Sequence, residues 1–347
     1  MTDNKSKEEG KKRRGAFILK AAFSALIFLV FLEVVLQAAH FAVVTFRPPP
    51  SLKHPGAPVI LCVGDSHTYG VLVPIEDSYP SQLQALFDQR GIPANVINDG
   101  IPGQNSSMLR QRLPEILEYY NPSIVIILSS ANNDWNKNDI ILSDLEDGVL
   151  EPGLRTLCLR VVYGFLGSLR TARLAAYTWN VLGRSHLPME QVEDHQGRVY
   201  FHNARFGTDD WDSRRVISDR SQRDLTRNID LARKHGAAAV LMNYVGQPAA
   251  PFTLGNDIIS SVAQVRSAPL VDNDAKIRSL FWKEDGTVDL EERNRLFLGG
   301  PEETHLQGPG YALVAKNVFS AIMENGLLEA PVEVPSRPDP SSPGSNK

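Results

Sequence analysis

Short apolar runs and amphipathic stretches alternate along the chain from about residue 58 to residue 328. The apolar runs are rich in β-branched residues, whereas the amphipathic stretches repeat their apolar positions with the helical period. We expect strands at 58–66, 94–99, 123–131, 237–245 and 269–274. We expect helices at 78–91, 108–121, 225–236 and 311–326, with Pro114 interrupting the second. This alternation predicts an α/β fold, a three-layer α/β/α sandwich around a mostly parallel sheet.

Residues 136–221 lack clear strand patterns and interrupt this alternation as a helical insertion. Apolar residues at helical spacing form a stripe in it: Leu154, Leu157, Cys158, Val161 and Phe165. The stripe is compatible with a lid over a site, a membrane-surface helix or a partner-binding surface. Because stripes at this spacing are most often core, we expect the insertion to pack on the domain.

The N-terminal region has the pattern of a membrane anchor. A basic cluster at 11–14 precedes an apolar segment at 16–46, and a bilayer span needs about 20 mostly apolar residues. Glu33 is a charge inside this segment, so we expect it near the outer interface or against a partner helix. A retained signal-anchor is favoured over a cleaved signal peptide or a buried helix of a soluble protein. Residues 1–15 are then the cytoplasmic tail.

The flanking segments and the overall charge narrow the interpretation further. Residues 47–57 are expected to be a stiff linker and residues 329–347 a disordered tail, leaving 58–328 as the globular domain. The net charge is −4, and the first fifteen residues carry six basic and three acidic side chains. The remainder is therefore acidic, which argues against nucleic acid as a partner. Cys62 and Cys158 are too few for a zinc motif, and a disulfide between them stays open.

Residues suited to nucleophilic catalysis follow three of the predicted strands. Ser66 follows the first strand, Gly103 the second and Asn133 the third, while His305 precedes the last predicted helix. A serine nucleophile needs a base to take its proton and donors to stabilise the oxyanion. Because open α/β sheets form their sites at the carboxyl ends of the strands, we expect these groups to meet there.

Four segments resemble the motifs of the SGNH, or GDSL-type, hydrolases. GDSHTYG is similar to the nucleophile block, NDGIPGQNS to the glycine block, ANND to the Gly-x-Asn-Asp block and EETH to the Asp-x-x-His block. The resemblance covers about residues 58–325, apart from the insertion. It implies the following roles: Ser66 as nucleophile and oxyanion donor, Gly103 and Asn133 as oxyanion donors, His305 as base and Glu302 as orienting acid.

Two positions depart from the family pattern. Ala131 replaces the usual glycine of the third block, and Glu302 replaces the usual aspartate of the fourth. Glu303 is the alternative acid, two residues before the histidine rather than three. A Ser–His dyad also stays open, because the acid orients the base and does not itself take the proton.

A metal site is the competing interpretation of the first block. Asp65-x-His67 matches the ligand pattern of metallophosphoesterases, but the later His-containing motifs that such enzymes need are missing. We therefore expect no metal and no other cofactor. Asp65 and Asp134 are expected to act as supporting residues that hydrogen-bond backbone amides where loops begin.

Taken together, these features predict a single-pass serine esterase in the inner membrane, with its catalytic domain in the periplasm. The resemblance implies ester substrates, and the membrane location favours O-acetyl groups on envelope or exported carbohydrate, or a lipid ester. Polysaccharide-assembly proteins are candidate partners. An O-acyltransferase and a non-catalytic assembly or binding protein on the same fold are the alternatives.

Overall fold

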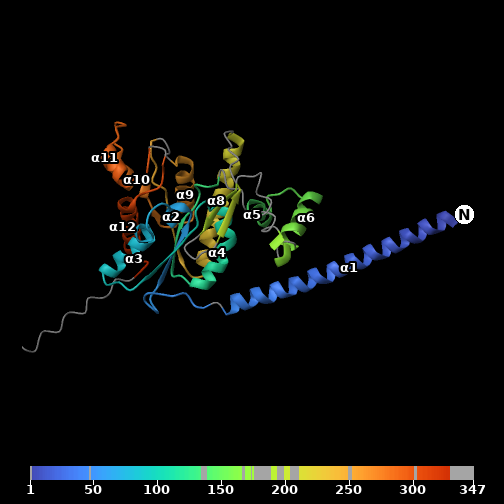
Figure 1. Cartoon of the computed structure of the whole chain (residues 1–347). Coiled ribbons are helices and arrows are strands. Elements are labelled where there is room, and N and C mark those ends of the chain that lie inside the picture. The colour runs from blue at the N-terminus through green and yellow to red at the C-terminus, as the bar shows by residue number, and fades with distance from the viewer. Residues whose placement is uncertain are drawn as a thin grey trace, which may run out of the picture. The chain divides into compact units, whose positions relative to one another are not determined.

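The computed structural model describes residues 2–46, 48–133, 139–165, 169–172, 174–175, 189–193, 199–203, 211–248, 252–300 and 303–328. The chain divides into two units (Figure 1). The smaller unit consists of residues 1–51 and 139–190, and the larger one of residues 52–138 and 191–347.

The larger unit is built on a five-stranded parallel sheet. Its strands are β1 (Val59–Gly64), β2 (Asn95–Gly100), β3 (Ile124–Leu128), β6 (Ala238–Met242) and β7 (Leu270–Val271). Their order is β2-β1-β3-β6-β7, and each neighbouring pair is parallel. The register sets Gly64 beside both Gly100 and Leu128, so the first three strands finish level with one another.

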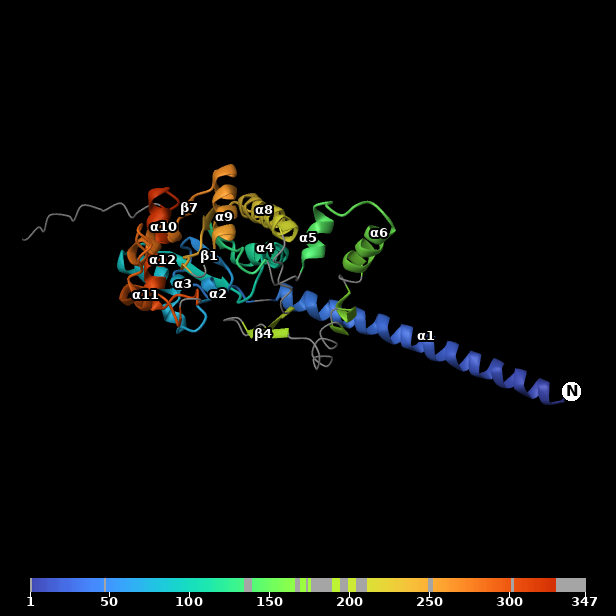
Figure 2. The ribbon, with the colours of Figure 1, turned by 90° about the horizontal axis from the view of Figure 1, so that it is seen from above.

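Helices cover both faces of this sheet. The connection from β1 to β2 contains α3 (Tyr79–Gln89), and the one from β2 to β3 contains α4 (Ser106–Tyr120). The chain moves from β1 to β2 in one direction along the sheet and from β2 to β3 in the other. Because parallel crossovers are right-handed, α3 and α4 therefore lie on opposite faces. On one face, α8 (Trp211–Lys234) packs against α4, and α9 (Thr253–Val265) packs against α8. On the other face, α12 (Gly308–Glu324) packs against α3 (Figure 2). The predicted α/β/α sandwich is confirmed.

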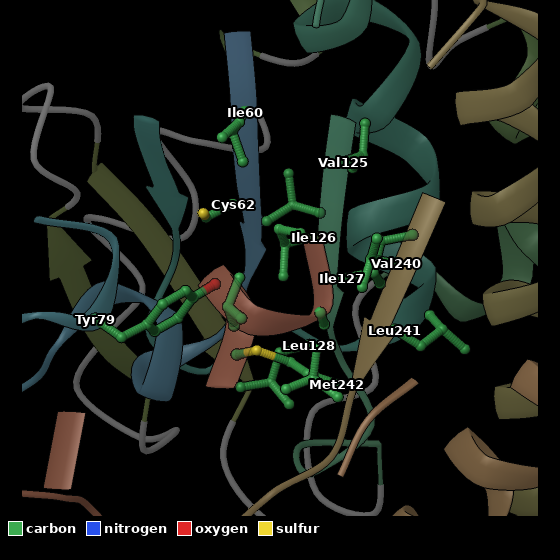
Figure 3. Packing of buried hydrophobic residues seen from close by; sticks show 14 of the residues in the cluster. Ile60, Cys62, Tyr79, Val125, Ile126, Ile127, Leu128, Val240, Leu241 and Met242 are labelled. Atoms are coloured by element: carbon green, nitrogen blue, oxygen red, sulfur yellow. The ribbon is translucent and has the colours of Figure 1, made fainter. Parts of the chain in front are cut away.

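The core of the larger unit lies along the central strands. Every residue of β1 and β3 is buried, and Figure 3 shows side chains of β1, β3 and β6 gathered around Ile126. Burial of each such aliphatic side chain stabilises the fold by roughly 1.5–3 kcal/mol. Cys62 belongs to this core, Cys158 is exposed, and both are free thiols.

Several boundaries differ from the prediction. Pro114 lies inside α4 without ending it, because buried residues on both sides of it, Leu113 and Leu117 among them, keep the helix against the sheet. Helix α8 begins at Trp211 rather than near residue 225. The region predicted to lack strands contains the paired β4 (Met189–Glu193) and β5 (Val199–Asn203). Two short helices, α10 (Asn273–Phe281) and α11 (Leu290–Leu296), precede α12 and were not predicted.

The smaller unit contains the long helix α1 (Thr2–Thr45) and part of the insertion. Residues Gly15–Ala42 of α1 form a segment that is long and apolar enough to cross a membrane. The insertion contributes α5 (Ile140–Glu146), α6 (Leu154–Arg160) and a π-helical turn, η2 (Val161–Phe165). The prediction that the apolar stripe of the insertion is core is wrong, because none of the residues of α6 and η2 is buried.

Candidate active site

Ser66 lies where β1 ends and a short helix begins. The strand stops at Gly64, and α2 (Ser66–Tyr69) starts after a single residue, Asp65. A Cβ at Gly64 would lie 2.3 Å from Thr68 Oγ1 and 2.5 Å from the Leu128 carbonyl, so only glycine fits this sharp change of direction. The Asp65 carboxylate caps α2 by accepting a hydrogen bond from the His67 amide at 3.0 Å. The hydroxyl of Ser66 is thereby fixed at the carboxyl edge of the sheet.

His305 meets Ser66 from the opposite end of the chain. Its Nε2 lies 2.8 Å from Ser66 Oγ, although 239 positions separate the two residues. The loop that carries His305 is held by a bridge between Phe297 and Leu306 and by the Leu298 amide, which donates to the His305 carbonyl at 2.9 Å. The structure thus brings together the predicted nucleophile and its predicted base.

Glu303 provides the carboxylate beside His305. Its Oε1 lies 2.6 Å from His305 Nδ1 and also accepts from the backbone amides of Thr304 at 2.9 Å and His305 at 3.0 Å. Burial alone would raise the pKa of Glu303, but the hydrogen bonds and charge of His305 outweigh it and lower that pKa. Glu302, the predicted acid, lies outside the described residues. Glu303, the alternative acid, occupies the position beside His305 Nδ1. The longer glutamate side chain folds back from two positions before the histidine.

Asp65 and Tyr244 connect the loop after β1 with the loop after β3. The phenol of Tyr244, just beyond β6, donates to Asp65 Oδ2 at 2.6 Å and accepts from the Ala131 amide at 3.2 Å. Asp65 is fully buried, and burial raises its pKa to about 6. The prediction that Asp65 hydrogen-bonds a backbone amide at a loop start is confirmed by its bond to His67, and its second carboxylate oxygen joins two loops of the site.

An aromatic cluster lies against the imidazole of His305. The ring of His67 stacks on that of His305, with centroids 4.7 Å apart and planes 15° apart. Tyr244 and Phe252 meet the same His67 ring edge-on at 5.2 and 5.5 Å. Burial, and then the charge of His305, lower the pKa of His67 well below its ordinary value. His67 is therefore a neutral wall of the site rather than a second base.

The loop after β2 reaches the same edge through Gly103 and Gln104. Gly103 has a φ of 74°, a backbone conformation that glycine adopts at little cost. The buried amide of Gln104 donates to the Gly64 carbonyl at 2.9 Å, and the Gln104 carbonyl accepts from Asn132 Nδ2 at 3.0 Å. These contacts hold the loops after β1, β2 and β3 together.

Asn133, predicted as an oxyanion donor, has its side chain bound between two helices. Its Oδ1 accepts from the Ser106 amide, and its Nδ2 donates to the hydroxyls of Ser106 and Ser221, on α4 and α8 respectively. Both N–H groups of an asparagine amide are used by these two serines. The side-chain amide of Asn133 is therefore bound between α4 and α8. The neighbouring Asn132 is half-buried, whereas Asn133 is buried. Asp134 lies outside the described residues.

Sequence comparison agrees with this arrangement of groups. The profile of the GDSL-like lipase/acylhydrolase family matches residues 62–313, well over half of the chain. The chain belongs to the GDSL-like lipase/acylhydrolase family. Its nucleophile block, GDSHTYG, falls within the matched residues, as do Gly103 and the EETH segment.

Relatives of this GDSL family member include named esterases. An arylesterase from Vibrio mimicus is 36% identical over 74 residues, which are 21% of this chain and 37% of the arylesterase. The match therefore spans little more than a third of that relative. Among solved structures, TesA has 15% identity and a TM-score of 0.44, covering 78% of this chain and 99% of its own.

Two further solved structures resemble this chain with identities and TM-scores close to those of TesA. The psychrotrophic esterase EstA from Pseudoalteromonas sp. has 16% identity and a TM-score of 0.43, covering 77% of this chain and 97% of its own. The acetyl xylan esterase AlAXEase has 16% identity and a TM-score of 0.44, covering 76% and 99%. The family profile supports acylhydrolase chemistry in general for this GDSL protein.

Sequence reasoning missed the residues that connect the loops of this GDSL site. Tyr244 binds Asp65 from 179 positions away, and Ser221 binds Asn133 from 88 positions away. The available signal was the run NYV at the carboxyl end of the strand predicted at 237–245, since polar residues there belong to the same sheet edge. The structure also speaks against the metal interpretation, because the Asp65 carboxylate is bound by Tyr244 and by the amide of His67, whose ring lies against His305.

Proposed function

We propose that this protein is a serine esterase with Ser66, His305 and Glu303 as its catalytic triad. The observation that carries the proposal is the continuous contact from Ser66 Oγ to His305 Nε2 at 2.8 Å and from His305 Nδ1 to Glu303 at 2.6 Å. Nucleophile, base and orienting acid in hydrogen-bond reach are the geometry of covalent acyl transfer. Intact contacts of this kind favour catalysis over a non-catalytic binding role.

In the proposed mechanism, His305 Nε2 takes the proton of Ser66 Oγ as this oxygen attacks the ester carbonyl. The tetrahedral intermediate collapses, the bond to the alcohol oxygen breaks, and His305 gives its proton to the leaving alcohol. Water, deprotonated by His305, then attacks the acyl-serine, and the carboxylic acid leaves as the proton returns to Ser66 Oγ. Glu303 holds the Nδ1 proton and stabilises the imidazolium in both halves of the reaction.

The oxyanion donors are proposed to come from the loops at the sheet edge. The backbone amides of Ser66 and Gly103 are the first two, and an asparagine amide after β3 is the third. Asn133 was predicted for the third position, but its contacts with Ser106 and Ser221 support a structural role. Asn132, which donates Nδ2 to the Gln104 carbonyl beside Gly103, is the alternative third donor.

The cellular location is proposed from α1. Its apolar run Gly15–Ala42 follows a basic N-terminal segment, and basic residues stay on the cytoplasmic side. The chain would be a retained anchor in the inner membrane, with the catalytic unit in the periplasm. Esters within reach there are O-acetyl groups on envelope or exported carbohydrate and lipid esters, and polysaccharide-assembly proteins are the proposed partners.

Fluorophosphonate labelling of the detergent-solubilised full chain, read by intact mass, tests the triad. Native protein is expected to gain one adduct, and Ser66→Ala and His305→Ala none. Hydrolysis of p-nitrophenyl acetate should fall in the same two variants, and added sugar acceptors would reveal any acyl transfer. If folded native protein gains no adduct, or Ser66→Ala hydrolyses the ester as fast as native protein, the proposal is wrong.

A further inference from the structure

Glu33 is an acidic residue within the apolar run of α1. It lies nine residues before Ala42, where this run ends. At 1.5 Å per residue this separation is about 14 Å along the helix axis. The polar layer on each side of a bilayer is only about 5–8 Å thick, so the carboxylate of a spanning α1 would lie inside the hydrocarbon of the outer leaflet. A charge at that depth needs hydrogen-bond donors.

The donors come from the insertion. Glu33 Oε1 accepts from the Arg170 amide at 2.9 Å, and Oε2 accepts from the amide and the hydroxyl of Thr171, both at 2.8 Å. Gln37, one turn further along α1, adds a bond to Oε1 at 2.6 Å. Three of the four donors thus belong to residues more than 130 positions away. Wherever Glu33 lies in the bilayer, Arg170 and Thr171 lie at the same depth.

The same part of the insertion exposes an apolar stripe. Leu154 is 78% exposed, Leu157 60%, Val161 52% and Phe165 63%. Their spacing of three or four residues sets them on one face of α6 and η2. Helical backbone can enter hydrocarbon because its hydrogen bonds are satisfied within the segment. Contiguous exposed apolar surface of this kind marks an interaction site.

We propose that α6, η2 and the Arg170–Thr171 segment lie in the outer leaflet beside α1, with lipid acyl chains covering the apolar stripe and Glu33 holding the insertion to the span. The proposal rests on the membrane span proposed above and concerns the smaller unit alone. Lipid is favoured over a protein partner because the stripe and the residues bound to Glu33 belong to the unit that contains the apolar helix. Arg155 and Arg160, also on α6, are long enough to extend their guanidinium groups to the interface.

The exposed thiol of Cys158 on α6 provides a reporter without mutation. Cys62 is fully buried and its pKa is raised to about 12, so a maleimide modifies only Cys158 in the folded chain. The full chain is labelled with a nitrobenzoxadiazole maleimide and reconstituted in phosphatidylcholine vesicles. Quenching by doxyl-labelled lipids is compared with quenching by aqueous iodide. We expect the Cys158 probe to be quenched at least fivefold more by doxyl lipid than by iodide.

Two control variants in a Cys158→Ser background calibrate the measurement. Leu26→Cys reports the middle of α1 and should be quenched by doxyl lipid, whereas Glu284→Cys, exposed in the larger unit, should be quenched by iodide. If the Cys158 probe behaves like the Glu284→Cys probe, or is shielded from both quenchers as in a protein interface, the insertion proposal is wrong. If the Leu26→Cys probe is not quenched by lipid, the membrane span itself fails. Fluorophosphonate labelling reports the esterase proposal separately.

Variants of Glu33 test its role as the tether. Glu33→Leu leaves the amides of Arg170 and Thr171 without their acceptor, so iodide quenching at Cys158 should rise at least twofold. Glu33→Gln retains a side-chain oxygen of the same reach and should stay close to native. Unchanged quenching in Glu33→Leu would overturn the tether, and retained fluorophosphonate labelling would show that the variant is folded.

Discussion

The ring of His67 lies flat against the base of the proposed triad, with its other neighbours edge-on. Since burial keeps this ring neutral, its contribution is shape rather than charge. We expect His67→Phe to retain most of the native kcat/KM. His67→Ala should lose roughly tenfold to a hundredfold, because a small displacement of a catalytic group has a cost of that order. Ester hydrolysis and the rate of fluorophosphonate labelling measure both variants, and equal losses in the two would contradict a packing role.

The choice between Glu303 and Glu302 is decided by a matched pair of variants. Glu303→Gln removes the carboxylate on His305 Nδ1 and should lower kcat by roughly 10²–10⁴-fold. Glu302→Gln should remain within about twofold of native, because Glu303 already occupies the position beside His305 Nδ1. A larger loss in Glu302→Gln than in Glu303→Gln would restore the original prediction. Thermal unfolding of both variants separates catalytic from structural effects.

The buried carboxyl of Asp65 makes stability depend on pH. Its pKa is raised from 3.8 to about 6 in the folded chain, so the unfolded state loses its proton first as pH rises. Between those values the folded state is progressively destabilised, by up to about 3 kcal/mol at pH 7. Asp65→Asn keeps an oxygen that can accept from the His67 amide, and it removes the destabilisation caused by the buried ionisable carboxyl. We expect the variant to gain stability over native at pH 7 but not at pH 4, measured by denaturant unfolding. A gain of equal size at both pH values would contradict the assignment.

At the scale of elements, Asn133 joins α4 to α8 through two serine hydroxyls. Asn133→Ala leaves these buried groups without their partner and should lower the free energy of unfolding by roughly 1–3 kcal/mol. Asn132→Ala should instead lower kcat, by roughly 10²-fold or more, and leave stability near native. The comparison needs both kinetics and unfolding. A large kcat loss at unchanged stability in Asn133→Ala would return the oxyanion role to that residue.

The strands were predictable because their runs of buried aliphatic residues leave little choice of structure. The contacts that each side chain of a motif makes were harder to predict from the sequence. The ANND block shows that asparagines follow β3, but not that the amide of Asn133 is bound by Ser106 and Ser221. The spacing of EETH likewise could not show that a glutamate two residues before His305 folds back onto its ring.

The apolar stripe of the insertion shows the same limit at the level of a helix. Leu154 and Phe165 have the spacing of a core face, and spacing alone does not distinguish a protein core from a lipid environment. The proposal that lipid covers the stripe depends instead on a distant contact, in which Glu33 accepts hydrogen bonds from Arg170 and Thr171 of the insertion. The sequence predicted Glu33 at an interface or against a partner helix, and it could not identify these two residues.

At the scale of the whole molecule, the proposed membrane span sets the two units in different environments. The basic residues before Gly15 predict that the larger unit lies outside the cytoplasm. Glu284→Cys in a Cys158→Ser background should react with a membrane-impermeant maleimide in cells whose outer membrane alone has been permeabilised. Cys62 stays buried and does not contribute. Reaction only after the inner membrane is broken would reverse the orientation.

The separation of Ser66 and His305 by 239 positions also has a consequence for timing. His305 lies just before α12, the last helix that the structure describes, and α12 packs against α3 near the start of the same unit. Ser66 therefore leaves the ribosome long before His305, and a chain that is still extended lacks the contact between the proposed nucleophile and the proposed base. In the proposed mechanism, hydrolysis can begin only after α12 docks against α3, so the activity would be confined to the compartment where folding is completed.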